Sequence, residues 1–416
     1  MKRSRRDFVR LTAAAGAAVG LGVDADPPAG EATRAPERAT GAAPGQSVPA
    51  DRFDPWVEVH RSALDHNVDV VSGLAGGRPI LAVIKNNAYG LGLLEAARLL
   101  AARSEIAGLA VVKPEDAVAL RDAGVRHDIL LMGMAPDEAV PELVARGVHL
   151  SLYLDDDARR LPALVPGATV AGHVYLDTGM SRMGIAYHRA LPWLRTLRDS
   201  GAFRIDGAFM GFTEETDFDR EQLTRFQGVS SDAASAGIPL GRLHAASSNG
   251  VYHLPEAHLD IVRPGIALFG GYPSRADEER AIAPLEPAVS LKCRVVRVAR
   301  LRAGDSVSYG RAYVADGPVW VATLPAGHAD GYPRGAVDGA RVEIGGATYP
   351  VIGAVSASHV IVELGPEPTV AVGDVATLVG RGSSDVHPNE VARASSSSVY
   401  DRFMHLNPSL PRHVVD

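Results

Sequence analysis

Hydrophobic positions from residue 56 to about residue 285 form short continuous runs that alternate with longer amphipathic stretches. Short continuous runs predict buried strands, and hydrophobic residues three to four positions apart predict helices that pack on them. The expected strands span residues 80–85, 108–112, 128–132, 148–153, 169–176, 205–212, 242–247 and 261–270. Helices are expected between the strands, among them residues 93–103, 114–123, 136–145, 188–200 and 220–236.

Eight strands that alternate with helices predict a (β/α)8 barrel, and a doubly wound open sheet is the alternative with the same pattern. The helical pattern stops after about residue 285, and only strand-like runs follow. These runs span residues 291–298, 319–324, 340–344, 349–355, 360–364 and 375–378. We therefore predict an α/β fold with a barrel over residues 53–285 and a smaller all-β domain over residues 286–416.

The N-terminus has the pattern of a targeting segment. A basic head with Arg3, Arg5 and Arg6 is followed by an apolar stretch that ends near Val23 and is too short to span a membrane. The segment SRRDFV at residues 4–9 matches the twin-arginine export pattern. We predict a signal peptide over residues 1–23, a flexible linker over residues 24–52, and delivery to the periplasm or exterior by the twin-arginine machinery.

Composition narrows the function classes. The net charge of −7 argues against nucleic acid as a partner. Cys293 is the only cysteine, so an intramolecular disulfide and a multi-cysteine metal site are excluded, and its alternating surroundings predict a small buried residue. The histidines are scattered without ligand spacing, and we expect no metal site.

The most informative stretch is AVIKNNAYGLG at residues 82–92, where an apolar run leads directly into Lys85. Lys85 would stand at the C-terminal end of the first barrel strand, and that end faces the active site. A lysine beside an apolar wall loses its proton more easily and can attack a carbonyl. On this pattern alone, a strand-end lysine that reaches into solvent is the commoner case.

The segment around Lys85 resembles the cofactor-lysine motif of the alanine racemase family. Other segments resemble that family in the same order: WVEV (56–59), DTGMSRMG (177–184), LPEAH (254–258), VRPGIALFG (262–270), VSYGR (307–311) and ADGYPR (329–334). The resemblance implies a (β/α)8 barrel followed by a β domain, and pyridoxal 5'-phosphate as cofactor. The implied activity is interconversion of L- and D-alanine, with an amino acid as the small-molecule partner.

The resemblance also implies catalytic residues. Lys85 would bind the cofactor covalently and act as one base, and Tyr309 would be the second base on the opposite face of the same Cα. In the family this tyrosine comes from the partner subunit, so a homodimer with shared active sites is implied. Without the resemblance, Tyr309 would be interpreted as a buried strand tyrosine.

Further family roles fall on residues that bind the cofactor or substrate. Arg263 would hydrogen-bond the pyridine nitrogen, the alternative being an arginine paired with an acid such as Asp260. Arg182 would orient Tyr309 and the substrate carboxylate, the alternative being a surface arginine. The remaining implied contacts are Ser248, Gly265 and Ile266 to the phosphate, the Tyr89 hydroxyl to the cofactor, and the Ala357 backbone N–H to the substrate.

Several positions depart from the family pattern. Gly211 aligns with a histidine that stacks on the cofactor ring, Ala357 and Ser358 replace a methionine and an acid, and His328 replaces a tyrosine that lines the substrate entry. The expected positions of a phosphate-contacting tyrosine and of a lysine carbamylated in some members correspond to Asn389 and Tyr175.

Loss of side-chain volume predicts a pocket for amino acids larger than alanine. The ending YDRF at residues 400–403, followed by PR at residues 411–412, is similar to the exported, broad-specificity branch of the family. Two other interpretations remain open: a degenerate racemase that binds the cofactor or an amino acid, and a decarboxylase on the same fold.

Overall fold

The computed structural model describes residues 52–280, 283–337 and 339–416. The predicted signal peptide and most of the predicted linker lie outside the described residues. Within those three ranges, no helix is both long and apolar enough to cross a bilayer.

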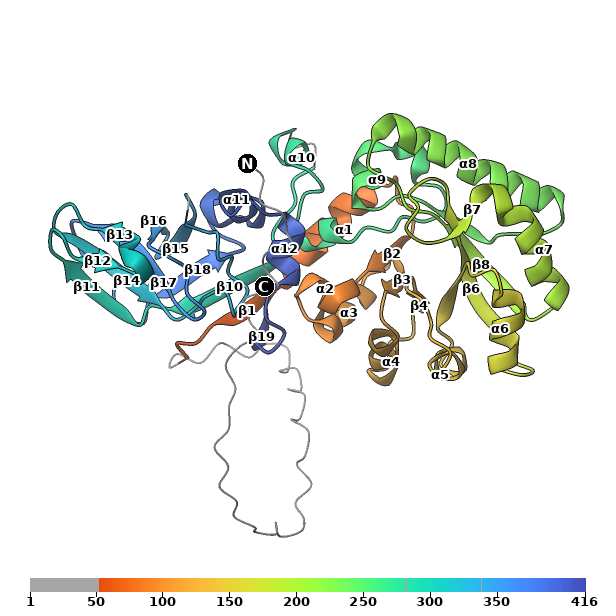
Figure 1. Cartoon of the computed structure of the whole chain (residues 1–416), viewed down its shortest axis with the longest axis horizontal. Coiled ribbons are helices and arrows are strands. Elements are labelled where there is room, and N and C mark those ends of the chain that lie inside the picture. Colours follow the sequence, from red (N-terminus) through yellow and green to blue (C-terminus); the bar gives the residue numbers. More distant parts are fainter. Residues whose placement is uncertain (1–51, 281–282, 338) are drawn as a thin grey trace, which may run out of the picture. The chain divides into compact units, whose positions relative to one another are not determined.

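A parallel sheet forms the first half of the described chain (Figure 1). Its strands pair in sequence order, and β7 (Ile185–Ala186) is attached to one of them at the side. They are β2 (Ile80–Val83), β3 (Ile106–Val111), β4 (Asp128–Leu131), β5 (His149–Leu152), β6 (Val170–Asp177), β8 (Phe203–Phe209) and β9 (Arg242–His244). Every one lies within a few residues of a strand expected from the apolar runs.

Residues 261–264 close this sheet into a barrel. The Arg263 N–H donates to the Ala246 carbonyl at 2.8 Å, and the Leu81 N–H donates to the Val262 carbonyl at 2.9 Å. The segment therefore pairs with the end of β9 on one side and with β2 on the other, which confirms the barrel. The expected eighth strand is wrong beyond Pro264, because Gly265 turns the backbone (φ −125°, ψ −87°) into a 3-10 helix.

Helices lie outside the barrel strands, and most of them follow one of these strands (Figure 1). The helix expected to start at residue 136 begins at Val140, because Pro136 and the three residues after it form a turn. The helices are α1 (Arg61–Leu74), α3 (Leu93–Ala101), α4 (Pro114–Asp122), α5 (Val140–Ala145), α6 (Asp157–Leu164), α7 (Ala190–Ser200), α8 (Thr216–Ser235), α9 (Ser248–His253) and α10 (Arg275–Arg280).

A nine-stranded sheet forms the second part, in the order β11-β14-β17-β16-β15-β18-β10-β1-β19. The expected run 319–324 coincides with β14, whereas the run 291–298 divides into two strands at Val295. The strands are β10 (Val289–Arg294), β11 (Arg297–Leu301), β14 (Val319–Leu324), β15 (Arg341–Ile344), β16 (Ala347–Ile352), β17 (Val360–Gly365), β18 (Val375–Val379) and β19 (Arg412–Val415).

Two features of this part differ from the expectation. Residues Trp56–His60 form β1, which pairs with β10 and β19 in the nine-stranded sheet, so the expected barrel segment from residue 53 includes a strand of the β domain. The β domain is also not purely β, because α11 (Pro388–Ala394) and α12 (Val399–Met404) lie in it. A capping box of Ser398 and Asp401 begins α12.

Candidate active site

Lys85 opens a short turn of unusual handedness. It begins α2 (Lys85–Tyr89), in which Asn86, Asn87, Ala88 and Tyr89 have φ values of 53°, 57°, 50° and 53°. Left-handed backbone costs an L-residue about 1–2 kcal/mol, although asparagine tolerates it better. Such strain persists only where the surroundings impose it, and it is common at functional sites.

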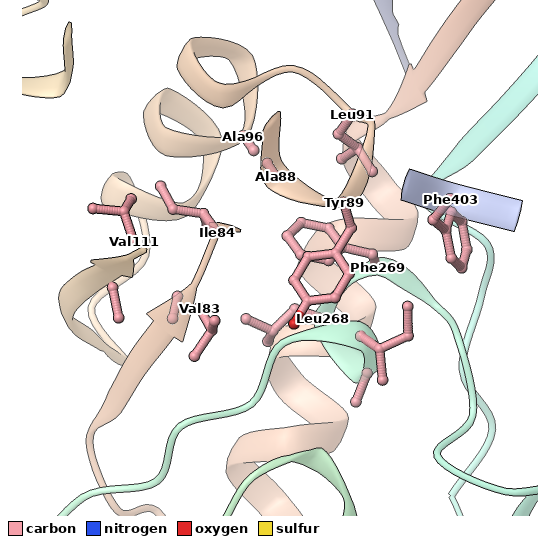
Figure 2. Close-up of a cluster of buried hydrophobic side chains, with 14 of the residues drawn as sticks. Val83, Ile84, Ala88, Tyr89, Leu91, Ala96, Val111, Leu268, Phe269 and Phe403 are labelled. Carbon is pink, nitrogen blue, oxygen red and sulfur yellow. The ribbon is translucent and has the colours of Figure 1, made fainter. Parts of the chain in front are cut away.

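The core and the C-terminal strand hold this turn in place. The side chains of Ala88 and Tyr89 are buried, and Figure 2 shows them among Leu91, Phe269 and Phe403. The Gly90 carbonyl, just after the turn, accepts hydrogen bonds from Nε and Nη2 of Arg412 in β19 at 3.1 and 2.8 Å. Packing and hydrogen bonds together therefore fix the direction in which the Lys85 side chain leaves the barrel strand.

The Lys85 amine lies in a setting that favours its neutral form. Burial lowers its pKa, and the positive charge of Arg182 lowers it further. Its Nζ is 5.7 Å from the centroid of the Tyr89 ring. A lysine with a lowered pKa supplies more of the unprotonated amine that attacks carbonyls.

A cradle of donors lies where β9 and the closing segment end. Ser248 Oγ accepts hydrogen bonds from the N–H groups of Gly265 at 3.0 Å and Ala267 at 3.2 Å, on either side of Ile266. A Cβ at residue 265 would lie 2.2 Å from the Tyr89 hydroxyl, so only glycine leaves room for that hydroxyl. The structure thus brings Ser248, Gly265, Ile266 and Tyr89 to one place, the end of a barrel at which phosphate groups bind.

Tyr400 in α12 belongs to the same place and was not assigned to the site from the sequence. Its ring centroid is 6.3 Å from that of Tyr89, and burial raises its pKa to about 12. The phosphate-contacting tyrosine was expected at Asn389. That assignment is wrong, because Asn389 stands in α11 with its N–H donating to His387 Nδ1, and the tyrosine beside Tyr89 is Tyr400.

Arg263 is buried and oriented by acceptors that carry no charge. Its Nη1 donates to His244 Nδ1 at 3.0 Å and its Nη2 to the Met210 carbonyl at 2.6 Å. Burial lowers its pKa to about 10, so it remains protonated at neutral pH. The alternative pairing with Asp260 is wrong, because that carboxylate accepts from the Leu243 N–H at 2.7 Å.

A chain of three histidines continues from Arg263 through the barrel interior. His244 Nε2 is 2.8 Å from His173 Nδ1, and His173 Nε2 is 3.3 Å from His149 Nδ1. Desolvation lowers the pKa of each ring, that of His173 to about 3. Among the described residues no three His, Cys, Asp or Glu side chains are grouped so that they hold a metal. The three histidine rings are therefore neutral, and their hydrogen bonds keep His244 Nδ1 as the acceptor for Arg263.

These buried rings predict a dependence of stability on pH. The unfolded chain binds protons on histidine near pH 6.5, whereas folded His173 does so only near pH 3, so stability falls as pH decreases through that window. Each histidine contributes a slope of about 1.4 kcal/mol per pH unit. We expect His173→Asn to flatten the fall in melting temperature between pH 7 and pH 5, and exposed His188→Asn to leave it unchanged. Identical pH profiles for wild type and His173→Asn would contradict the burial argument.

Arg182 borders the space left by Gly211. A Cβ at residue 211 would lie 3.7 Å from Arg182 Nη2, 3.2 Å from Met180 Sδ and 3.9 Å from the Tyr175 hydroxyl. The space that the family's histidine would occupy at position 211 is thus bordered by the Met180 thioether. Methionine is a flexible side chain that fills irregular gaps. Arg182 is exposed in the single chain, as the surface-arginine alternative expected, yet it lies near enough to Lys85 for its charge to lower the pKa of that amine.

Tyr309 and Ala357 stand in the β domain. Tyr309 begins a 3-10 turn between β12 (Ser306–Val307) and β13 (Tyr313–Val314) and is 81% exposed, so the interpretation as a buried strand tyrosine is wrong. Ser308 Oγ donates to the Ala354 carbonyl at 3.1 Å, which fixes the turn near the loop of exposed Ala357. Among the described residues of one chain, no hydrogen bond or ring contact joins Tyr309 to Lys85.

Fold and site define a class of protein: a pyridoxal-phosphate enzyme built from a barrel and a β domain. The comparisons then give the family. Residues 59–273 match the alanine racemase N-terminal domain, and residues 288–414 match the alanine racemase C-terminal domain. The chain belongs to the alanine racemase family, as the sequence resemblance predicted.

Individual relatives agree over nearly their whole length. The alanine racemase of Syntrophobacter fumaroxidans is 36% identical over 356 residues, covering 83% of this chain and 93% of the relative. The crystal structure of the alanine racemase from D-cycloserine-producing Streptomyces lavendulae has a TM-score of 0.82 at 26% identity and covers 89% of this chain and 98% of its own. The Bacillus anthracis alanine racemase with bound L-Ala-P has a TM-score of 0.79 at 28% identity, with coverages of 88% and 95%.

Proposed function

We propose that this protein interconverts L- and D-alanine with pyridoxal 5'-phosphate, and that it also accepts larger amino acids. The observation that carries the proposal is the Lys85 amine, with its lowered pKa, beside the donor cradle of Ser248 and Gly265. The residues fit the cofactor. Lys85 would bind its aldehyde carbon, and the donor cradle with the Tyr89 hydroxyl would hold its phosphate. When bound, the cofactor draws electron density from the substrate Cα and so makes its proton more acidic.

A two-base arrangement suits racemisation, because one face of the substrate Cα loses a proton and the other face gains one. We propose Lys85 for one face and the partner subunit's Tyr309 for the other, in a homodimer with shared sites. The 81% exposure of Tyr309 supports this, because a tyrosine ring held on a folded turn in water leaves much apolar surface to cover. Arg182 and the Ala357 N–H would then bind the substrate carboxylate.

Arg263 favours racemisation over decarboxylation. A guanidinium donates hydrogen bonds and hardly releases a proton, so it would leave the pyridine nitrogen unprotonated and limit the electron withdrawal by the ring. His244 supports this role because its Nδ1 accepts from Arg263 and holds the guanidinium in place.

The larger substrates follow from Gly211. We expect Gly211→His to lower exchange of the Cα hydrogen in larger amino acids at least tenfold relative to alanine, because the new side chain occupies the space beside Met180. Deuterium exchange over the common amino acids, with cofactor absorbance recorded alongside, measures both preference and activity. An unchanged ratio in the variant argues against this use of the space. If the cofactor-loaded wild type exchanges the Cα hydrogen of no amino acid, the proposed racemase activity is wrong and a binding protein is supported instead.

We further propose that the protein leaves the cytoplasm by the twin-arginine route. The segment SRRDFV and the short apolar stretch after it support the proposal. Because this route carries folded proteins, the cofactor would be loaded before export. Replacing Arg5 and Arg6 by lysine should retain the protein in the cytoplasm, as judged by cell fractionation, whereas Arg10→Lys should not. Export of the double variant at the normal level would contradict the route.

A further inference from the structure

A pocket of about 260 Å³ lies between the loop of residues 327–335 and the segment that carries α11 and α12. We name it the α12 pocket. Its polar lining residues are His328, Tyr332, Arg334, Ser395, Arg402 and His405. It contains none of the residues that hold the cofactor at the Lys85 site, although α12 contributes to both and His328 is the position that the family resemblance places at the substrate entry.

Two buried polar groups of this pocket have no partner. Arg402 is 7% exposed, its Nε has no hydrogen-bond partner, and desolvation lowers its pKa although the charge of Asp401 raises it again in part. Tyr332 is 0% exposed, and its hydroxyl also has no partner. A buried cation that no ion pair neutralises is costly, and buried polar groups are almost always hydrogen-bonded. Two such groups at one pocket therefore indicate a ligand that supplies the missing contacts.

The acids nearest in the chain are already occupied. Asp401 accepts from the Ser398 N–H at 3.2 Å as part of the capping box of α12. Asp330 accepts from the Gly327 N–H at 2.9 Å within its own loop. The pocket lining contains no Asp or Glu, so no carboxylate of the lining pairs with its cations, and the neighbouring Asp401 offsets the charge of Arg402 only in part.

We propose that the α12 pocket binds a small oxyanion, such as phosphate or a carboxylate. The Arg402 guanidinium would supply the charge and paired N–H donors that match an oxyanion, and the Tyr332 hydroxyl would donate a further hydrogen bond. The site has a structural consequence, because the same helix places Tyr400 beside Tyr89 and Phe403 in the core (Figure 2). An anion on Arg402 would hold α12, and with it the aromatic wall of the cofactor cradle.

Calorimetric titration of the dialysed, cofactor-loaded protein tests the proposal. Inorganic phosphate, acetate and chloride are titrated separately at constant ionic strength. We expect saturable binding of phosphate or acetate at one site per chain, with chloride weaker. Affinity should fall at least tenfold in Arg402→Leu and several-fold in Tyr332→Phe. Arg393→Leu removes an exposed arginine of α11 that pairs with Glu390, and it should bind as the wild type does.

The outcomes show which kind of anion binds, and they distinguish the α12 pocket from the cofactor cradle. Preference for phosphate indicates an inorganic or ester phosphate, and preference for acetate indicates a carboxylate metabolite. Binding should survive Ser248→Ala, because that residue belongs to the cofactor cradle. Wild-type protein that binds none of the three at millimolar concentration overturns the proposal, as does binding that is equal in Arg402→Leu. The Tyr332→Phe variant keeps the test decisive if Arg402→Leu does not fold.

Discussion

Replacing Lys85 with alanine is expected to abolish the near-ultraviolet to violet absorption of the cofactor-loaded protein and to lower racemisation at least about 10³-fold. The reason is that one amine has two tasks, covalent attachment of the cofactor and proton transfer on one face of the substrate. No other described amine competes for either, because Lys113 and Lys292 lie elsewhere: Lys113 is exposed after β3, and Lys292 pairs with Glu58 at 2.7 Å. Absorbance spectra and exchange rates of purified protein measure both effects.

Lys113→Ala is the matched control for this experiment. Lys113 follows a parallel barrel strand as Lys85 does, but it is exposed and precedes an ordinary α-helix. Wild-type absorbance and activity are expected from it. If the Lys85 variant retained the absorption band while the Lys113 variant lost it, Lys113 and not Lys85 would be the cofactor lysine.

Tyr309→Phe is expected to leave the absorption band intact and to slow racemisation by about 10²–10⁴-fold. Since the equilibrium constant between enantiomers is one, kcat/KM must fall equally for both. The asymmetry appears instead in solvent exchange without inversion. The enantiomer whose Cα hydrogen faces Lys85 should still take up deuterium, and its mirror image should not. Equal loss of exchange in both enantiomers argues against two bases. Tyr313→Phe, in β13 of the same hairpin, is the control.

Mixing the two inactive variants tests whether the site is shared. A mixed dimer of Lys85→Ala and Tyr309→Phe chains would contain one site with both bases and one site with neither. Activity should therefore reappear after the variants are co-refolded or co-expressed. If Tyr309 acted within its own chain, each site would still lack one base and activity would stay low.

The barrel was predictable because parallel strands buried on both faces are continuous apolar runs. β1 was not, because its short alternating pattern suits either part of the chain. Its place is decided by pairing with β10 and β19, more than 200 residues away along the chain. The eighth predicted strand ends earlier than expected, at Pro264, for a different reason. Apolar residues continue through the 3-10 helix, so hydrophobicity alone does not show where the extended backbone ends.

The active site likewise combines residues that local motifs predicted with residues that only the structure revealed. Lys85, Ser248, Gly265 and Tyr89 stand in local motifs, and the structure brings them together as those motifs implied. Tyr400 and Met180 act through long-range contacts, with Tyr89 and with the space at Gly211, that no local pattern records. Arg402 was noted only as part of a resembling segment, and its buried Nε without a hydrogen-bond partner became visible only in three dimensions.

The bond between Arg412 and the Gly90 carbonyl has a consequence for biosynthesis. Arg412 follows Gly90 by 322 positions, so in synthesis from the N-terminus the turn emerges long before its partner does. The turn that aims the cofactor lysine would therefore be completed late, after most of the β domain has been made. Tight loading of vitamin B6 phosphate would then require both parts of the chain to have folded.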